Sequence, residues 1–260
     1  MTTNPNKSLT IVTGCDSTHA KSQLNFLASA KKFEPNTRVI VYDLGMRPRQ
    51  LRKLKKKFDY EIRTFDYAKY PSFFNIKVAA GEFGWKPVII EEVARECRGI
   101  ICWMDAGNII TAPLDAIVDE TIRIGFYRVT TNHSILKWTH PGMLNYFETP
   151  ENWDGGQDMS AGGCLAFNSA DQRSMKLISN WSKYAKIKEC LAPLGSNRGN
   201  HRQDQALLSI LASLENWPPI DVNIKRPFAF HQDDDANIGQ HIYRRYKRIR
   251  NWAKARFTKA

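Results

Sequence analysis

The sequence predicts an α/β fold in which helices flank a mixed, mainly parallel β-sheet. Two observations carry this expectation. Residues 8–65 alternate between short apolar runs and helical segments, the order that builds parallel strands joined by right-handed crossovers. Residues 99–104 then form a wholly apolar run that stops at a carboxylate, as a fully buried strand does. With 260 residues, 42% of them apolar, the chain is long enough for one sizeable core.

The first half of the chain supplies most of the expected sheet. We expect strands at residues 8–13, 38–43 and 60–65, a helix after the first strand, and a short basic helix over residues 48–58. A helical stretch from residue 76 to residue 97 contains Gly81, Gly84 and Pro87, which predict interruptions. The next strand ends at Asp105. Ligands of open α/β sheets lie beyond the carboxyl ends of strands, so Asp105 is a candidate functional residue; alternatively it caps a turn or a helix.

The second half predicts one long irregular region and fewer strands. Residues 130–156, rich in Asn, Pro, Gly, His and Trp, predict a loop or lid. A strand over residues 160–167 opens with paired glycines, where a ligand or another backbone approaches closely. Helices are expected over residues 170–190 and 203–214. No repeat or linker divides the body, so we expect one domain over residues 1–241, followed by a tail at residues 242–260.

The formal net charge of +12 is concentrated in two segments. Residues 242–260 carry eight basic side chains and residues 46–57 carry seven, with no acid in either, so the other 229 residues carry a net charge of −3. On a helix, the tail aligns Ile242, Tyr246, Ile249, Ala253 and Phe257 in one apolar stripe among basic residues, which is typical of a helix lying on anionic lipid. The alternative is a solvated helix that docks its stripe on the body. Nucleic acid is not expected as a partner, because no binding module accompanies the charge.

Composition also bears on compartment and on covalent chemistry. No window approaches the roughly 18 uninterrupted apolar residues of a membrane-spanning helix, and residues 1–7 lack the apolar stretch of a signal peptide. The five cysteines include no C-x-x-C pair, which indicates neither a disulfide framework nor a zinc site. We expect a cytoplasmic protein that is peripheral on the inner face of the membrane.

Four segments hold most of the residues suited to chemistry: Gly84-Trp-Lys-Pro87, Trp103-Met-Asp-Ala-Gly107, Ser160-Ala-Gly-Gly163 and His201-Arg-Gln-Asp-Gln205. With the first strand, Ile11-Val-Thr-Gly14, they resemble in order and spacing the landmarks of nucleotide-sugar glycosyltransferases of the GT-A fold. More narrowly, they are similar to a bacterial glycosyltransferase-like group with Trp-Lys-Pro, Asp-Ala-Gly and His-Arg-x-Asp-Gln segments. The resemblance covers residues 8–215. It implies a GT-A sheet and transfer of a sugar from a nucleotide diphosphate sugar to a hydroxyl of a glycan or glycolipid, as in polysaccharide or lipopolysaccharide assembly.

The resemblance implies a donor site at the ends of the first and fourth strands. Backbone groups there would line the nucleobase and ribose, although an ordinary strand-to-loop transition explains the same residues. Lys86 would bring a cation to the diphosphate or donor sugar, with Trp85 and Pro87 restricting its surroundings; the alternative is a solvated charge. The expected nucleotide-binding residues are Thr13, Gly14, Cys15, Lys86, Asp105, Ala106 and Gly107.

Asp105 stands where the family has the first carboxylate of its D-x-D motif, which coordinates a divalent cation that bridges two phosphates. The resemblance therefore implies Mn²⁺ or Mg²⁺, held by Asp105 and by His231, which is near a late histidine ligand of related enzymes. Position 107 departs from the motif because it is Gly rather than Asp. Either other ligands complete the metal site, or cations such as Lys86 stabilise the leaving diphosphate. His231 is alternatively structural or solvated.

The remaining matched residues imply a sugar-binding side. The paired glycines would let a sugar lie against the backbone, or alternatively form a bulge. Asp204 opens a helix with an apolar continuation, so it would point into the cleft and act as base on the acceptor hydroxyl if the reaction inverts; alternatively it caps the helix. We expect Lys86 and Asp204 to be catalytic, and substrate contacts from Trp85, Gly162, Gly163, His201, Arg202 and Gln205.

Two rival functions stay open. Gly107 is compatible with a GT-A-fold protein that binds its ligand without turnover. The two basic segments alone are compatible with a module that binds anionic membrane or nucleic acid. Binding of a nucleotide diphosphate sugar separates the enzyme from the second rival, and turnover separates it from the first.

Overall fold

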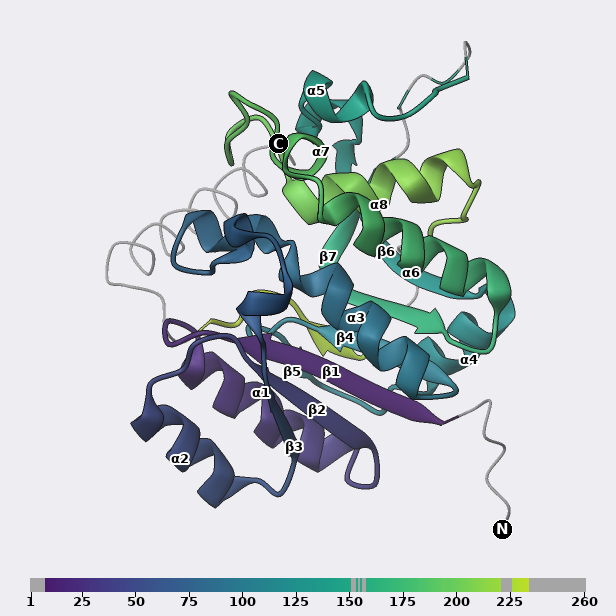
Figure 1. Cartoon of the computed structure of the whole chain (residues 1–260). Helices are drawn as coiled ribbons and strands as arrows, with labels where there is room; N and C mark the ends of the chain where they lie inside the picture. Colours follow the sequence, from purple (N-terminus) through teal and green to yellow (C-terminus); the bar gives the residue numbers. More distant parts are fainter. Residues whose placement is uncertain (1–7, 151–152, 154, 156–157, 221–225, 234–260) are drawn as a thin grey trace, which may run out of the picture.

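A six-stranded sheet of mixed direction is the centre of the computed structural model, which describes residues 8–150, 153, 155, 158–220 and 226–233 (Figure 1). The strands lie in the order β3-β2-β1-β4-β7-β6. The parallel strands are β1 (Leu9–Cys15), β2 (Arg38–Asp43), β3 (Glu61–Thr64) and β4 (Ile100–Met104). The antiparallel ones are β7 (Asp158–Asn168) and β6 (Phe126–Ser134). The predicted mixed, mainly parallel sheet is therefore confirmed.

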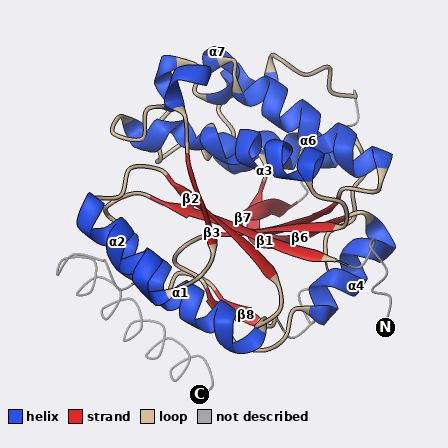
Figure 2. Cartoon of the chain, turned by 60° about the horizontal axis from the view of Figure 1, so that its bottom comes forward, coloured by secondary structure: helices blue, strands red, loops and turns tan. Residues whose placement is uncertain are grey.

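Helices cover both faces of this sheet (Figure 2). One face carries α1 (Ala20–Phe33), α2 (Pro48–Lys57) and α4 (Asp115–Ile124). The other carries α3 (Trp85–Glu96), α6 (Gln172–Ala185) and α8 (Gln203–Leu214). The short helices α5 (Pro141–Leu144) and α7 (Lys188–Leu191) contact each other, and a small ladder pairs β5 (Ile109–Ile110) with β8 (Phe228–Ala229).

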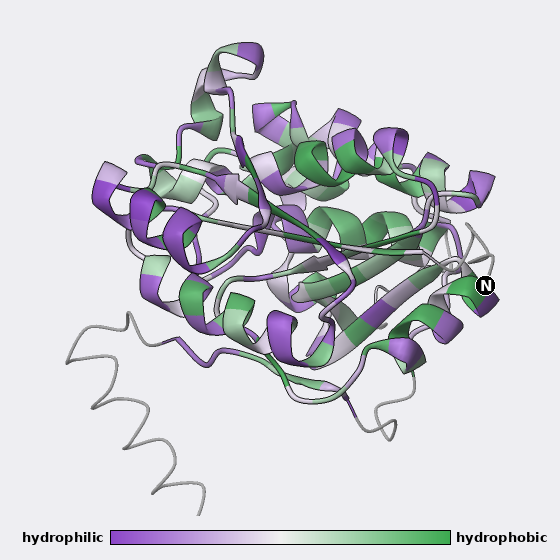
Figure 3. Cartoon of the chain, turned by 90° about the horizontal axis from the view of Figure 1, so that it is seen from below, coloured by the Kyte–Doolittle hydropathy of each residue, from purple (hydrophilic) through white to green (hydrophobic). Residues whose placement is uncertain are grey.

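The sheet separates two hydrophobic cores, because successive side chains of a strand point to opposite faces. In β4, Ile101 and Trp103 belong to the core under α3, α6 and α8, whereas Ile100, Cys102 and Met104 belong to the core under α1, α2 and α4. All five side chains are fully buried. Figure 3 shows the corresponding pattern, with hydrophobic residues between the layers and hydrophilic ones on the outward helix faces. Burial on both sides explains why this strand contains no polar residue.

The segment before α3 differs from the sequence prediction. After the single turns η2 (Tyr67–Lys69) and η3 (Ser72–Phe74), residues predicted as helix form η4 (Ala79–Phe83), a tight turn with left-handed backbone angles. α3 then begins at Trp85. Pro87 does not interrupt it, because it lies in the first helical turn, where a backbone N–H has no partner within the helix.

The expected lid over residues 130–156 begins instead as strand. β6 continues to Ser134 because it pairs with β7, and η5 (Leu136–Trp138) and α5 follow it. The predicted tail at residues 242–260 lies outside the described residues. None of the helices in the described ranges is both long enough and apolar enough to cross a bilayer.

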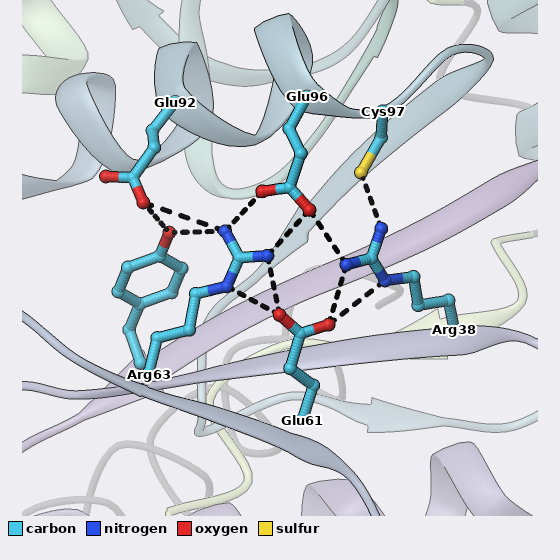
Figure 4. A network of polar contacts seen from close by, with 7 residues as sticks. Arg38, Glu61, Arg63, Glu92, Glu96 and Cys97 are labelled. Carbon is cyan, nitrogen blue, oxygen red and sulfur yellow. Dashed lines mark hydrogen bonds and ion pairs between the residues drawn. The ribbon is translucent and has the colours of Figure 1, made fainter.

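An ion-pair network ties α3 to the edge of the sheet (Figure 4). Arg63 of β3 contacts Glu61 at 2.5 Å and Glu96 at 2.7 Å, and Arg38 of β2 contacts the same two glutamates at 2.7 and 2.9 Å. Glu96 is the last residue of α3. Hydrogen bonds from Arg63 and Arg38 lower the pKa of Glu96 to about 2. The network therefore fixes the C-terminal end of the helix whose first turn carries Lys86.

We expect Glu96→Gln to lower the free energy of unfolding by about 1 kcal/mol at neutral pH, because partly exposed ion pairs contribute at most about this much. The folded-state pKa of Glu96 is depressed, so its stabilising effect is present above the ordinary glutamate pKa of 4.5 and is lost as the pH falls toward 2. Urea unfolding across this range measures the difference. Glu148→Gln, at an exposed glutamate outside the network, is the control. Equal losses in both variants would contradict the assignment.

Candidate active site

Asp105 directly follows the buried strand β4. Its N–H donates to the Gly163 carbonyl at 2.9 Å, which holds the residue beside β7. Its Oδ1 accepts hydrogen bonds from Trp103 Nε1 at 2.7 Å and from Lys86 Nζ at 3.1 Å. The side chain is 40% exposed, so the carboxylate remains open to a ligand. Asp105 therefore lies where ligands of open α/β sheets bind, beyond the carboxyl end of a strand.

A left-handed turn delivers Lys86 to the same edge. The five residues of η4 have φ between 46° and 63°, a conformation that costs a non-glycine residue roughly 1–2 kcal/mol. Packing holds the turn: Trp85 Nε1 donates to the Ala80 carbonyl at 3.0 Å. Any Cβ at Gly84 would overlap the Phe74 ring, so only glycine fits there. The turn thereby sets the direction of the first turn of α3.

Lys86 is a buried ammonium group. Its side chain is 6% exposed, and Nζ donates to Asp105 Oδ1 and to the Gly162 carbonyl at 3.0 Å. The ammonium lies 5.3 Å from the centre of the Trp103 ring, within cation–π range. Burial alone would lower the pKa of Lys86, but the charges of Asp105 and Asp204 raise it above its ordinary value. Lys86 is therefore a fixed positive charge in a site shielded from water.

Asp204 faces Lys86 from the start of α8. Its Oδ2 lies 3.7 Å from Lys86 Nζ, and within the described part of the chain this buried oxygen makes no hydrogen bond. Burial raises the pKa of Asp204, Lys86 opposes this effect and Asp105 adds to it, which gives a pKa of about 6. The preceding Gln203 has a φ of 34°, and its Nε2 donates to Glu82 Oε2 of η4 at 3.2 Å. A side-chain hydrogen bond therefore joins two residues with left-handed backbone angles, Glu82 and Gln203, across the site.

The paired glycines of β7 lie in a bulge. Between two regular pairs of the β6–β7 ladder, residues 161–164 of β7 lie opposite Val129 alone. This irregularity turns the Gly162 carbonyl toward Lys86, whereas the Gly163 carbonyl accepts from the N–H after β4. The interpretation of these glycines as a bulge is therefore confirmed, and the sugar contact stays a prediction.

Two adjoining cavities meet at Asp105 and Lys86. The first, here the β1 cavity, measures about 390 Å³ and reaches the end of β1 at Gly14 and Cys15. The second, here the α8 cavity, measures about 340 Å³ and lies between β7 and the start of α8. Each volume is within the range of small-molecule sites. The residues that line both are Phe83, Lys86, Asp105, Arg198 and His231.

The structure gathers most of the predicted residues at these cavities. The β1 cavity contains Gly14, Cys15, Trp85, Lys86, Asp105, Ala106, Gly107 and His231. The α8 cavity contains Lys86, Asp105, Gly162, Gly163, Arg202, Asp204, Gln205 and His231. The four segments, far apart in the sequence, are therefore brought together at two adjoining cavities.

Two predicted residues lie elsewhere. Thr13 lines neither cavity; it is fully buried, and its hydroxyl donates to Gln23 Oε1 at 3.3 Å. His201 is also fully buried, with Nε2 bonded to the Leu191 carbonyl at 2.9 Å and Nδ1 accepting from the His140 N–H at 3.2 Å. Burial lowers the pKa of His201, which keeps the ring neutral. His201 lines neither cavity, because its ring is bonded between two loops, and its substrate contact stays a prediction.

The sequence did not identify several residues of the cleft. Phe83, Arg198 and Arg226 come from irregular segments, so no periodicity places them at the cavities. Trp103 is different, because residues i and i+2 of a strand share a face and Trp103 precedes Asp105 by two positions. That spacing is a signal from which its hydrogen bond to Asp105 could have been expected.

A comparison with solved structures now bears on the fold. The chain is similar to an active-site mutant of LgtC, with a TM-score of 0.51 and 15% identity over 76% of this chain and 68% of that chain. The fold is that of a GT-A glycosyltransferase. A weaker likeness is to galactosyltransferase LgtC in complex with donor and acceptor sugar analogs, with a TM-score of 0.48 and 17% identity over 76% of this chain and 69% of that chain. Another is to apo mouse xyloside xylosyltransferase 1, with a TM-score of 0.47 and 12% identity over 83% of this chain and 84% of that chain.

Comparisons of sequence add little to this GT-A assignment. A family model described as "Protein of unknown function (DUF1647)" matches residues 1–91, the part that runs from β1 into α3 and includes Lys86. No curated protein matches the sequence significantly. The fold is therefore established by structure, and the chemistry of the site has to be argued from its residues.

The cation expected in a GT-A site can be tested against the residues present. A Cβ at Gly107 would overlap the Asp233 carboxylate, so a carboxylate from a distant segment occupies the place of the missing D-x-D side chain. However, Asp105 Oδ1 already accepts from the Lys86 ammonium. Within the described ranges, no three or more His, Cys, Asp or Glu side chains are grouped to hold a metal ion. The described residues alone therefore form no complete metal site, and metal ligation by Asp105 and His231 stays a prediction.

The stability lost when Lys86 is removed from its contacts with Asp105 and Asp204 should depend on pH. We expect Lys86→Met to lower the free energy of unfolding by about 3–5 kcal/mol at pH near 7.5, as loss of one partner of a buried ion pair does. The loss is smaller near pH 5, because Asp204, whose pKa is about 6 even beside Lys86, then takes up a proton. Chemical unfolding at both pH values measures this difference.

The double variant Lys86→Met/Asp204→Asn is the matched control. It removes both charges, so it should regain part of the stability that Lys86→Met loses at neutral pH. A loss that is the same at both pH values, with no recovery in the double variant, would show that Lys86 contributes through packing alone.

Proposed function

We propose that this protein transfers a sugar from a nucleotide diphosphate sugar to a hydroxyl of a glycan or glycolipid acceptor. One observation carries the proposal: the buried Lys86 and Asp204, with the partly exposed Asp105, lie where two cavities meet, at the carboxyl edge of a GT-A sheet. Buried charges arranged around an accessible cleft are more typical of a functional site than of a structural core.

The β1 cavity is the proposed donor site. Gly14 and Cys15 bring backbone groups to its wall at the end of β1, where the planar base and ribose would bind. Lys86 and Asp105 lie at its inner end, so a nucleotide in this cavity would direct its diphosphate toward the ammonium group. The sugar attached to the diphosphate would then extend into the α8 cavity, past the side-chain-free backbone of Gly162.

In the proposed reaction, the bond between the anomeric carbon and the diphosphate oxygen breaks, and the electron pair leaves with the nucleotide diphosphate. A bond forms from the anomeric carbon to the acceptor oxygen. The proton of the acceptor hydroxyl passes to Asp204 if the configuration inverts, or to an oxygen of the leaving diphosphate if it is retained. Lys86 stabilises the charge that develops on the leaving diphosphate, because a preorganised cation shielded from water interacts strongly with it.

Asp204 is the proposed hydroxyl-binding carboxylate. Asp204 lines the α8 cavity, and its buried Oδ2 accepts no hydrogen bond within the described ranges. In this position it holds a hydroxyl of the donor sugar or, if the configuration inverts, takes the proton of the acceptor. A pKa of about 6 leaves the carboxylate ionised at neutral pH and makes it a stronger base than an ordinary aspartate.

Thermal unfolding against a panel of nucleotide diphosphates and nucleotide sugars, with and without Mn²⁺ or Mg²⁺, tests the donor site. A nucleotide at 100 times its dissociation constant should stabilise the protein by about 2.7 kcal/mol. We expect one nucleotide to do so. We expect Asp105→Asn to remove the part of the shift that depends on Mn²⁺ or Mg²⁺, whereas Asp59→Asn, at an exposed position, leaves the shift unchanged.

Release of nucleotide diphosphate from the matching nucleotide sugar then tests turnover. We expect Asp204→Asn and Lys86→Met to abolish release. Selective binding without release would support the GT-A-fold binding protein instead, and the absence of any nucleotide shift in a folded sample would contradict the donor site. The dependence of the shift on Mn²⁺ or Mg²⁺ tests the predicted cation.

Helix α2 supports a second element of the proposal, association with an anionic membrane surface that presents the acceptor. The basic side chains between residues 47 and 57 are all exposed, and Leu54 is the buried residue of this helix. Each basic residue near an anionic surface contributes roughly 1 kcal/mol of binding. The predicted contribution of residues 242–260 is tested separately by deleting them.

We expect the triple charge reversal Arg52→Glu/Lys53→Glu/Lys56→Glu to reduce co-sedimentation with phosphatidylglycerol vesicles by about tenfold or more, because it reverses three charges on the exposed face of α2. Thermal stability should not change, since these side chains are outside the core. Phosphatidylcholine vesicles are the control for charge. Unchanged sedimentation of the variant would refute the role of α2.

A further inference from the structure

The α8 cavity has a basic wall. Arg198 belongs to the loop before α8, Arg202 is the N-cap residue of α8, and Arg226 lies two residues before β8. Each guanidinium lies over an aromatic ring, with the carbon atom 5.3, 3.9 and 5.8 Å from the ring centres of Phe83, Trp138 and Phe230, respectively. Stacking orients a guanidinium and leaves its in-plane N–H groups available to an acceptor.

These three arginines make no ion pair within the described part of the chain, whereas arginines such as Arg38 and Arg63 pair with glutamates. The carboxylates of the α8 cavity, Asp105 and Asp204, both face Lys86. Four cationic side chains and two carboxylates line this cavity, which gives a formal charge of +2. Two cations and three carboxylates line the β1 cavity, which gives −1.

Two of the like charges are held close together. Arg202 Nη1 donates to the backbone carbonyl of Arg198, which fixes the guanidinium of Arg202 beside that loop. Burial, and then the charge of Arg198, lowers the pKa of Arg202. Asp204 interacts favourably with Arg198, but the cavity keeps an excess of positive charge, and a bound anion would relieve the remaining repulsion. The N-terminal end of α8 adds a partial positive charge at the same place.

A second feature of the cavity also indicates a polar ligand. The hydroxyl oxygen of Thr131 is buried in the wall and makes no hydrogen bond within the described ranges. Buried hydroxyl groups in folded proteins are nearly always hydrogen-bonded. A ligand oxygen near Thr131 would satisfy it, so the hydroxyl and the arginines point to the same kind of occupant.

We propose that the α8 cavity binds an acceptor sugar that carries an anionic group, a phosphate or a carboxylate, and that Arg198 and Arg202 hold this group. The inference rests on the proposed function, because it takes the β1 cavity as the donor site. Arg202 and Asp204 both belong to the start of α8, so an acceptor anchored at Arg202 has its hydroxyls within reach of the Asp204 carboxylate. Charge-assisted hydrogen bonds to guanidinium groups would select such an acceptor over a neutral one.

Calorimetric binding of glucose 6-phosphate, glucuronate and glucose tests this proposal on the full chain. We expect the two charged sugars to bind about tenfold more tightly than glucose, since one charge-assisted hydrogen bond has about this effect. Arg198→Gln and Arg202→Gln should each remove most of this preference. Arg52→Gln removes the same charge from α2, outside the cavity, and should leave the preference intact. Thermal unfolding verifies that each variant is folded.

The arginines could hold either the anionic group of an acceptor or the diphosphate of the donor. Binding of the nucleotide diphosphate that stabilises the protein in thermal unfolding distinguishes the two. Unchanged affinity for this nucleotide in Arg202→Gln supports an acceptor site. If Arg202→Gln weakens the nucleotide as much as it weakens glucose 6-phosphate, the arginines hold the donor diphosphate and the proposal is overturned. Equal affinity of the wild-type protein for glucose and the charged sugars also overturns it.

The result that would refute the proposed function differs from the result that would refute the anionic acceptor. A protein that binds glucose 6-phosphate through Arg198 and Arg202 but no nucleotide would retain the anion site and refute the donor site. A protein that binds and turns over a nucleotide sugar but shows no preference for charged sugars would retain the proposed function and refute the anionic acceptor.

Discussion

The contact between Lys86 and the carboxylates of Asp105 and Asp204 is the interaction around which the cleft is organised. It joins α3, the end of β4 and the start of α8, and through the Gly162 carbonyl it also reaches β7. A buried ammonium group is costly unless it is paired and hydrogen-bonded, so these elements must approach one another closely for the folded state to be stable. The same arrangement leaves one oxygen of Asp204 available to a ligand.

Contacts at both ends of α3 fix the position of Lys86 in its first turn. At its start, the left-handed turn η4 is anchored by Trp85 and is bonded through Glu82 to Gln203 of α8. At its end, Glu96 pairs with arginines of β2 and β3. The strained backbone lies only at the cleft end, and the ion-pair network lies only at the far end. This division is typical of a site in which local strain is tolerated because the surrounding packing determines it.

The distribution of charge along the cleft divides it into two chemical environments. The β1 cavity is slightly negative, whereas the α8 cavity is positive and is lined by arginines that lie over aromatic rings. Lys86 and Asp105 lie on the boundary between the two. A reaction that joins two different substrates needs such a boundary, because each substrate has to be recognised separately while the reacting atoms meet.

The fold class, the four parallel strands and the position of Asp105 at a strand end were accessible from the sequence, because apolar periodicity and abrupt strand ends are local signals. Lys86 and Asp204 were singled out by the resemblance of their segments to those of GT-A glycosyltransferases, not by periodicity. The left-handed turn before Trp85, the strand in place of a lid at residue 130 and the burial of His201 were not, because each depends on packing against distant segments. The arginine wall illustrates the limit most clearly. Its members lie in irregular segments, and only the folded chain brings Arg226 to the cavity that Arg198 and Arg202 also line, since side-chain proximity across a cleft has no sequence period.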